Sequence, residues 1–589
     1  MNSALAHRGP DADKVKIVNQ GIGFGHRRLS IIDLDTRAEQ PMVSNNGKTI
    51  IVFNGEIFNF QDLKKELEEY TFKTQSDTEV LLAGYELKGI KWLMSRINGM
   101  FAVAIYDTEE DKLILIRDRF GIKPLYYYQD ETALIFSSEI KGILHSGLVE
   151  AKFNTNAIDD YLAFRQVREP YSFFKNIRCV RSATYLTFEK GSLKNEQYYW
   201  ELPKLNFSQK YDELAILAET RSQVETAIKR WQIADVKVGS YLSGGVDSSL
   251  TSAILSQDAS NHLHTYTIGF KEEKFNEFHY AQIVADCYQT MHHAFLLTQT
   301  DYFSEWNRLI GFKDAPLAVP NEIPLAIMST RLSEDISVVI SGEGADELFG
   351  GYGKIFRSSF DFRNHEIWKE NTFYDYFTSL YEYVPRGIRD SFLSNKVNYR
   401  EEFDKKIETD FSNYQDEENI FRFFHSFHIK GLLNRVDMTT MQASVEARPP
   451  FMDHELISFV YSEVPYDLKL KWNNKAAQKE AQSLFASEYS ETLDTPKYIL
   501  KKIAEEYLPK DVIYRKKMGF PVPLTNWFPE VSEKASKLLL HTEWLRKNKV
   551  SELCNRIKST PSDRSGQILW MFLNIELFRQ QYFEKTWKW

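Results

Sequence analysis

Hydrophobic and polar residues alternate over short distances from residue 1 to about residue 200, as in a domain built from short strands. The clearest strand-like runs cover residues 49–53, 100–106, 112–117 and 133–136. Between them, hydrophobic residues recur at helical spacing over residues 61–70, 78–88 and 92–97. Strands and helices mixed in this order predict stacked sheets with helices on the outside.

The pattern changes after a polar stretch over residues 192–209, which we expect to connect two domains, at residues 1–195 and 205–589. An amphipathic helix is predicted over residues 211–231, and strand-like runs follow at 236–242, 264–270 and 337–341. Alternating strands and helices predict a doubly wound parallel sheet, in which ligands bind at the carboxyl ends of the strands.

The first run of this second domain leads into a glycine turn and then into residues with helical spacing. The turn and the start of the helix contain Ser243, Gly244, Gly245, Asp247, Ser248 and Ser249. Free backbone N–H groups and the positive end of a helix dipole suit a phosphate or pyrophosphate group. The serine hydroxyls add donors, and Asp247 can orient a Mg²⁺ ion held on the phosphates. Taken alone, the same residues are equally typical of a tight turn with a helix cap.

Composition narrows the classes of protein that fit. The chain has 589 residues, of which 43% are hydrophobic and 26% charged, and a formal net charge of −9. This charge argues against a general nucleic-acid binder, and no apolar run approaches the roughly 20 residues of a membrane span. Cys179, Cys287 and Cys554 are scattered, as expected of reduced thiols. We therefore expect a cytoplasmic protein without nucleic-acid or membrane partners.

Four motifs of the second domain resemble motifs of known families. The Ser-Gly-Gly-Val-Asp-Ser-Ser turn at residues 243–249 is similar to the pyrophosphate loop of ATP pyrophosphatases, and a lysine-bearing P-loop is absent. The string from Ser341 to Tyr352 and the strings at residues 444–453 and 515–523 resemble the asparagine synthetase B family. The resemblance implies an α/β doubly wound ATP-pyrophosphatase (adenine nucleotide α-hydrolase-like) domain over residues 205–589.

The resemblance also implies which residues bind ATP. Besides the glycine turn, the positions that would contact the base, ribose or phosphates are Leu242, Ile268, Ser341, Gly342 and Lys497. The catalytic residues would be Lys517, which meets the α-phosphate in the transition state, and Glu343, which deprotonates ammonia. Asp247 and Asp346 would hold Mg²⁺.

Polar clusters of the first domain resemble the glutaminase domain of class II glutamine amidotransferases, an α+β N-terminal-nucleophile fold. The residues implied to hold glutamine are Arg28, Asn54, Gly55, Glu56 and Asp77. Asp77 and Glu56 can meet the α-amino group, and Arg28 the α-carboxylate. In that family the mature chain begins with a cysteine nucleophile, whereas residue 2 here is Asn and no cysteine precedes Cys179. We therefore expect this polypeptide to take free ammonia rather than to hydrolyse glutamine.

The sequence thus predicts an ATP-dependent ligase that adenylates aspartate to β-aspartyl-AMP and forms asparagine, and the resemblance suggests a homodimer. Two alternatives stay open. A paralogue of the family would amidate or cyclise another carboxylate, such as a sugar acid or a β-lactam precursor. The other alternative is a non-enzymatic binding or regulatory module. Such a module would have no need of all three motifs at residues 243–249, 341–352 and 515–523.

Overall fold

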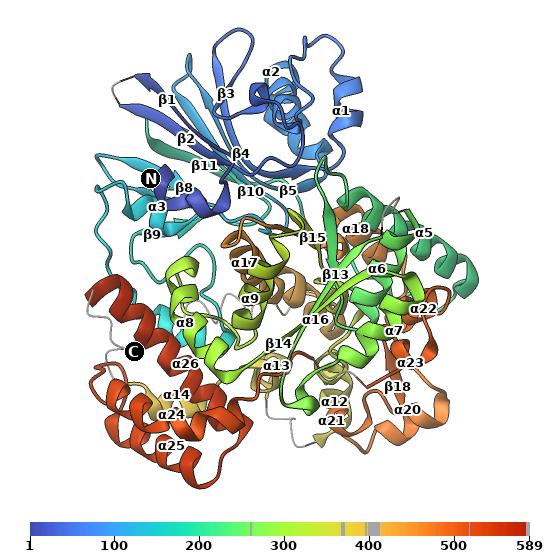
Figure 1. The fold of residues 1–589 in the computed structure, drawn as a ribbon. Coiled ribbons are helices and arrows are strands. Elements are labelled where there is room, and N and C mark those ends of the chain that lie inside the picture. The colour runs from blue at the N-terminus through green and yellow to red at the C-terminus, as the bar shows by residue number, and fades with distance from the viewer. Residues whose placement is uncertain are drawn as a thin grey trace.

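The computed structural model describes residues 1–19, 21–258, 262–366, 371–394, 397, 411, 413–516 and 519–584. Figure 1 shows the N-terminal part of the chain, in blue, above the remainder, with the last helices in red at the lower left. In these described residues, no helix combines the length and the apolar character needed to cross a membrane.

The N-terminal part is built on a six-stranded antiparallel sheet with the order β11-β10-β6-β5-β4-β3. Its strands are β3 (Met42–Val43), β4 (Thr49–Ile57), β5 (Gly99–Asp107), β6 (Lys112–Arg117), β10 (Thr184–Glu189) and β11 (Ser192–Tyr198). Two smaller sheets accompany it, formed by β1 (Ala12–Asn19), β2 (Ile22–Arg28), β7 (Tyr126–Gln129), β8 (Leu134–Ser137) and β9 (Ile177–Cys179). The four strand-like runs predicted in this part are confirmed as β4, β5, β6 and β8.

Strand β4 is buried on both faces, because its side chains alternate between two cores. Ile51 and Phe53 pack in the core that contains α1 (Phe60–Glu66) and α2 (Asp77–Arg96). Ile50 and Val52 pack with residues of β2 and β7 in a separate core between the sheets. Burying each such side chain stabilises the fold by roughly 1.5–3 kcal/mol. The predicted stacked sheets with helices outside are therefore present.

The connection between the two parts is shorter than predicted. Residues 192–198 form β11, which pairs with β10 across a turn at Gly191. All its residues but one are exposed, because β11 is the edge strand of the sheet. An edge strand facing water carries polar side chains, so its composition resembled that of a linker. The connection runs from residue 199 to α5 (Glu213–Trp231).

The second part contains a five-stranded sheet with the order β14-β13-β12-β15-β16, in which every neighbouring pair is parallel. Its strands are β12 (Val238–Tyr241), β13 (His264–Phe270), β14 (Met291–Leu297), β15 (Val338–Ile340) and β16 (Glu446–Arg448). The predicted parallel sheet is confirmed, and β14 and β16 are strands that the sequence did not predict.

Helices cover both faces of this sheet. One core contains side chains of α5, α6 (Val246–Asp258) and α7 (Phe278–Tyr288), and the other contains side chains of α8 (Gln299–Lys313), α9 (Glu322–Leu332) and α17 (Ile429–Met441). The second core continues into α24 (Leu524–Leu539), α25 (Lys547–Ser559) and α26 (Asp563–Arg579). Trp570 of α26 stacks on Trp306 of α8 with ring centroids 5.9 Å apart, which joins the last helices to the sheet.

Short elements complete both parts of the chain. They are α3 (Ile140–Leu144), α4 (Ala157–Phe164), α10 (Ala345–Phe349), α11 (Gly353–Phe356), α12 (Ser358–Asn364), α13 (Phe373–Tyr381), α14 (Arg386–Phe392), α16 (Asp416–Phe423), α18 (His454–Ser462), α19 (Tyr466–Lys469), α20 (Lys475–Ala481), α21 (Ala486–Tyr489), α22 (Tyr498–Ala504), α23 (Lys510–Ile513), β17 (Leu470–Trp472) and β18 (Asp494–Pro496).

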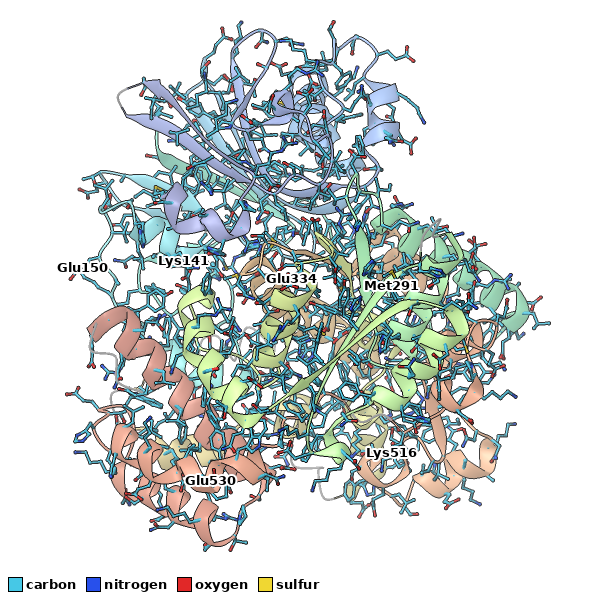
Figure 2. The ribbon with its side chains drawn as sticks, in the orientation of Figure 1. Lys141, Glu150, Met291, Glu334, Lys516 and Glu530 are labelled. Carbon is cyan, nitrogen blue, oxygen red and sulfur yellow. The ribbon has the colours of Figure 1, made fainter. Side chains whose placement is uncertain are left out.

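Polar contacts between the parts fix their relative position. Lys141 of α3, labelled in Figure 2, donates through Nζ to the carbonyl oxygen of Phe312 in α8 at 2.6 Å. Arg8 bridges Glu139 and Asp437 at 2.9 and 2.8 Å, and all three side chains are buried. A buried charge that loses its partner is strongly destabilising. These ion pairs therefore favour one relative arrangement of the two parts.

Candidate active site

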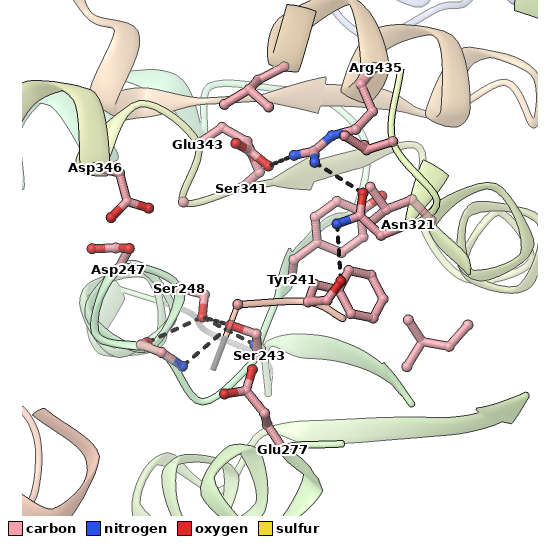
Figure 3. Close-up of a pocket in the computed structure, with 18 of the residues that line it drawn as sticks. Tyr241, Ser243, Asp247, Ser248, Glu277, Asn321, Ser341, Glu343, Asp346 and Arg435 are labelled. Atoms are coloured by element: carbon pink, nitrogen blue, oxygen red, sulfur yellow. Dashed lines mark hydrogen bonds and ion pairs between the residues drawn. The ribbon is translucent and has the colours of Figure 1, made fainter. Parts of the chain in front are cut away.

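A cavity of about 590 Å³ lies at the carboxyl ends of β12, β13 and β15. The structure brings together there the following predicted ATP-site residues: Leu242, Ser243, Gly245, Asp247, Ser248, Ile268, Ser341 and Gly342. They come from three segments far apart in the sequence, and the parallel sheet aligns the ends of those segments. Figure 3 shows the polar side chains of these segments directed toward one space.

The glycine turn requires glycine at residue 244, because the backbone there is left-handed and packs closely against α7. Gly244 has a φ of 71°, and a Cβ atom there would lie only 2.5 Å from Cβ of Tyr280. Ser248 accepts a hydrogen bond from the backbone N–H of Ser243 at 3.1 Å, and the two serine hydroxyl oxygens lie 3.0 Å apart (Figure 3). Helix α6 begins at Val246, so the positive end of its dipole faces the cavity.

Ser249 differs from the other serines of the turn. Its side chain is fully buried, it does not line the cavity, and its hydroxyl has no hydrogen-bond partner within the described part of the chain. One residue along an α-helix rotates the side chain by about 100°, which carries Ser249 from the cavity side of α6 into the core. The structure therefore does not place the hydroxyl of Ser249 where a phosphate would meet it.

Lys497 joins the two acidic residues predicted to hold a metal ion. Its Nζ atom lies 2.6 Å from Oδ2 of Asp247 and 2.6 Å from Oδ1 of Asp346. Burial alone would lower the pKa of Lys497, but the two carboxylates raise it above its ordinary value. Figure 3 shows Asp247 and Asp346 facing each other across the cavity edge. The predicted Lys497 is thus close to the glycine turn, although it does not line the cavity itself.

Glu343 projects into the same cavity and is paired with Arg435 of α17. Arg435 forms an ion pair with the Glu343 carboxylate through Nη2 and donates to Oδ1 of Asn321 through Nη1 at 3.2 Å (Figure 3). The Glu343 side chain is 25% exposed and that of Arg435 10% exposed. Glu343 is therefore accessible from the cavity, while Arg435 holds its carboxylate in place.

Arg515 is, like Arg435, a cationic residue at the cavity whose contacts only the structure revealed. Its Nε donates to the carbonyl oxygen of Gly244 at 2.8 Å, and its guanidinium forms an ion pair with Glu277 and lies 4.6 Å above the ring of Tyr280. It thereby fixes the glycine turn from the far end of the chain. Lys517, two residues later, lies outside the described residues.

Glu347 is a buried carboxyl group behind the cavity wall. Burial and the neighbouring carboxylates of Asp346 and Glu343 raise its pKa to about 8. The hydroxyl of Tyr352 donates to Glu347 at 2.9 Å, and Nε2 of His428 lies 3.6 Å away. Tyr352 and His428 line the cavity. No local sequence pattern pointed to His428, because it reaches the site from a helix whose other residues are mostly packing contacts.

A smaller pocket of about 120 Å³ lies in the N-terminal part. It is lined by all five residues predicted to hold glutamine, namely Arg28, Asn54, Gly55, Glu56 and Asp77. Arg28 donates to the backbone oxygens of Asp35 and Ile32 at 2.9 and 3.3 Å, so part of its guanidinium supports the pocket wall. Gly55 has a φ of 138°, and a Cβ atom there would lie 2.0 Å from the carbonyl oxygen of Met100.

The carboxyl groups of this small pocket are strongly perturbed. Burial raises the pKa of Asp77 to about 6, although a hydrogen bond from the backbone N–H of Ile57 at 3.0 Å opposes the shift. Burial and the nearby Asp77 raise the pKa of Glu56 well above its ordinary value. Glu56 Oε2 and Asn54 Nδ2 are buried without a hydrogen-bond partner among the described residues. Buried polar atoms left in this state are suited to a polar ligand.

The second part of the chain helps to enclose this pocket. Glu446 of β16 and Met441 of α17 line it together with the N-terminal residues. The fully buried Arg448 lies 2.9 Å from Glu446 and 3.4 Å from Glu56, and Lys123, also fully buried, lies 3.2 Å from Glu446. β16 therefore contacts the small pocket through Glu446 and Arg448 and belongs to the same sheet whose other strands end at the large cavity.

Comparisons with known proteins agree with this division of the chain. A sequence model described as a glutamine amidotransferase domain matches residues 1–200, and one described as asparagine synthase matches residues 219–580. Asparagine synthetase [glutamine-hydrolyzing] 1 of Bacillus subtilis is 30% identical over 98% of this chain and 93% of its own length. Asparagine synthetase [glutamine-hydrolyzing] 3 of the same organism is 30% identical over 93% of this chain and 86% of its own length. A putative asparagine synthetase of Methanocaldococcus jannaschii is 36% identical over 60% of this chain and 72% of its own length.

Proposed function

Since the chain belongs to the asparagine synthetase family, we propose that it makes asparagine from aspartate in an ATP-dependent reaction that passes through β-aspartyl-AMP. One observation carries the proposal. The glycine turn, the Ser341–Gly342 segment and Glu343 line one cavity at the carboxyl edge of a parallel sheet. This is the edge at which such sheets bind nucleotides. The cavity supports an ATP-pyrophosphatase fold for the second part, and the match of residues 1–200 to a glutamine amidotransferase domain supports an N-terminal-nucleophile fold for the first.

In the first half-reaction, a β-carboxylate oxygen of aspartate attacks the α-phosphorus of ATP. A new P–O bond forms, the bond to the β-phosphate bridge breaks, and pyrophosphate leaves. The turn from Ser243 to Ser248 would hold this pyrophosphate through backbone N–H groups and the end of the α6 dipole. Lys517 would stabilise the charge on the α-phosphoryl group in the transition state, as the family resemblance implies.

Asp247 and Asp346 have the donor set for a Mg²⁺ ion on the ATP phosphates. Both carboxylates reach one point, because each lies 2.6 Å from the same Nζ atom of Lys497. Mg²⁺ is commonly bound through one or two carboxylates together with phosphate oxygens. When bound, the ion would offset the negative charge of the triphosphate. Lys497 neutralises the pair of carboxylates and keeps them close to the phosphate-binding turn.

In the second half-reaction, ammonia attacks the acyl carbon of β-aspartyl-AMP, and AMP leaves with the electrons of the C–O bond. The attacking nitrogen must lose a proton, and we assign its acceptance to the Glu343 carboxylate. Arg435 forms an ion pair with this carboxylate and holds it where it lines the cavity. The small pocket would hold glutamine through Glu56, Asp77 and Arg28, all of which line it.

The thiol of Cys179 does not have the character of a glutaminase nucleophile. It is buried away from the small pocket, and burial raises its pKa to about 12, so the reactive thiolate is disfavoured at neutral pH. We therefore do not assign glutamine hydrolysis to Cys179, and we take ammonia as the nucleophile of the synthetase reaction.

Pyrophosphate release from the purified protein with ATP, Mg²⁺ and aspartate tests the proposal. Parallel reactions contain ammonium, glutamine or neither, and asparagine is measured in each. We expect aspartate-dependent pyrophosphate release and asparagine in the ammonium reaction. Turnover with glutamine would add glutaminase activity to the proposal. If aspartate produced no pyrophosphate under any condition, while a sugar acid or a β-lactam precursor did, the assignment of aspartate would be wrong.

A further inference from the structure

Two histidines and an aspartate meet at the amino edge of the parallel sheet, opposite the edge that forms the large cavity. His264 is the first residue of β13, His293 is the third residue of β14, and Asp335 lies in the connection from α9 to β15. Met291 and Glu334, labelled in Figure 2, are close in sequence to His293 and Asp335 and mark this edge. Among the described residues, these three form the single group whose candidate metal-ligand atoms all lie within 4.8 Å of one another.

The donor atoms of the three side chains lie close together. Nδ1 of His264 lies 3.3 Å from Nε2 of His293, which in turn lies 4.0 Å from Oδ2 of Asp335. The hydroxyl of Tyr266 lies 3.4 Å from Nδ1 of His264 and 3.3 Å from Oδ2 of Asp335. Ligands bound at about 2.0–2.2 Å in a tetrahedral zinc site are separated from one another by about 3.3–3.6 Å. The separation between the two imidazole nitrogens matches these values, and the separation between His293 and Asp335 is somewhat longer.

Direct hydrogen bonds do not account for the contact between His293 and Asp335. Hydrogen bonds from hydroxyl or ring N–H groups are usually about 2.7–3.2 Å long, and 4.0 Å is beyond their range. The contact between His293 and Asp335 is therefore too long for a direct hydrogen bond, whereas the hydroxyl of Tyr266 lies within hydrogen-bonding reach of His264 and Asp335. The site also remains open, because the side chains of His293 and Asp335 are 31% and 38% exposed.

The sheet holds the ligands in place before any ion binds. Tyr266 pairs with His293 in the parallel register of β13 and β14, and His264 lies two residues earlier on the same face of β13. The rings of His264 and His293 are nearly parallel, with centroids 5.4 Å apart, and Tyr266 stacks on His293 at 4.8 Å. His292 faces the other side of the sheet, where its Nδ1 lies 2.9 Å from the hydroxyl of Thr265.

We propose that His264, His293 and Asp335 bind a divalent transition-metal ion of the Zn²⁺ type, with the hydroxyl of Tyr266 beside it. Two imidazoles and one carboxylate form a donor set that suits Zn²⁺ or Co²⁺, whereas Mg²⁺ prefers oxygen ligands only. The site is thus chemically distinct from the Asp247–Asp346 pair. An ion here would link β13, β14 and the connection to β15, and it would stabilise the folded sheet from the edge opposite the nucleotide.

Metal titration of the full-length protein tests the site. The protein is first treated with a chelator and dialysed, and Co²⁺ is then added without ATP while visible ligand-field absorption is recorded. Bound Zn²⁺ is measured separately by equilibrium dialysis. We expect one strongly bound ion with nitrogen ligation. His264→Ala and His293→Ala should each weaken binding at least about tenfold, as losses around protein metal sites commonly do.

Two further variants make the result decisive. Asp335→Asn keeps the size of a partly exposed side chain, so it reports ligand loss even if a histidine variant fails to fold. His279→Ala removes an exposed histidine of α7 outside the cluster and should bind Co²⁺ like the unchanged protein. Zn²⁺ should also raise the melting temperature of the unchanged protein but not of Asp335→Asn. The proposal is overturned if the unchanged protein binds no ion, or if the cluster variants and His279→Ala bind it equally.

Discussion

Arg435 and Glu343 form an ion pair inside the large cavity, although 92 residues separate them in the sequence. The guanidinium comes from α17 and the carboxylate from the segment after β15, so the pair exists only when both elements pack on the sheet. Arg435 also donates to Asn321 at 3.2 Å, and this second contact fixes the guanidinium that holds the Glu343 carboxylate. The proposed proton acceptor is therefore oriented by a residue from a different element.

Glu343→Gln should separate the two half-reactions. The amide cannot accept a proton at neutral pH, so asparagine formation with ammonium should fall by about 10²–10⁴-fold. Aspartate-dependent exchange of labelled pyrophosphate into ATP should continue, because adenylation does not need Glu343. Glu334→Gln, an exposed change outside the cavity, serves as the control. Equal loss of exchange and of asparagine formation would contradict the role assigned to Glu343.

Lys497→Met should lower the stability of the protein without ATP, and added Mg²⁺ should restore part of that stability. The change leaves two nearby carboxylates without the cation that lies 2.6 Å from each of them, and such losses cost about 3–5 kcal/mol when the pair is buried. Because both carboxylates are partly exposed, we expect the lower end of this range or less. Thermal unfolding with and without Mg²⁺ measures the effect, with the exposed Lys537→Met as control. Identical Mg²⁺ responses in both variants would argue against the metal role of the pair.

Gly244→Ala should impair ATP use through the shape of the turn. A Cβ atom would lie 2.5 Å from Cβ of Tyr280 and 2.7 Å from the backbone nitrogen of Ala281, in addition to the strain at a φ of 71°. Gly147→Ala is a matched control, because Gly147 has a φ of 75° but no atom within 4 Å of the added methyl group. Both variants should lose about 1–2 kcal/mol of stability to backbone strain. Only Gly244→Ala should raise the KM for ATP, by at least about tenfold. An unchanged KM would exclude the proposed contact.

The stability of the small pocket should depend on pH through Asp77. Its pKa is raised to about 6 in the folded state from an ordinary value of 3.8, so the folded protein binds more protons than the unfolded protein between these values. The contribution of Asp77 to the free energy of unfolding therefore falls as the pH rises from about 4 to 6, by an amount on the order of 3 kcal/mol. Asp77→Asn removes this titration while keeping a side-chain oxygen for the N–H of Ile57. Its stability relative to the unchanged protein should rise over this pH range and then stay constant, as measured by urea unfolding. A pH-independent difference would contradict the raised pKa.

Local patterns in the sequence determined much of the fold and the position of the glycine turn. Short hydrophobic runs predicted β4, β5, β6 and β13, because the residues of a buried strand are themselves apolar. The same logic failed for β11, whose edge position leaves its side chains in water and removes the hydrophobic signal. The motif around Ser243 was visible because a strand, a turn and a helix start are consecutive in the chain.

Only the tertiary structure decided which distant groups meet. The sequence contains Lys497, Arg515 and Arg435, but packing on the sheet brings them to Asp247, Gly244 and Glu343. Packing also turned Ser249 into the core, and it brought His264, His293 and Asp335 together at the opposite edge. Secondary structure follows from interactions over a few residues, which a sequence displays directly. Distances between side chains of different elements, and the burial of those side chains, determine ion pairing, metal ligation and pKa. Both depend on how whole helices and strands pack in the complete fold.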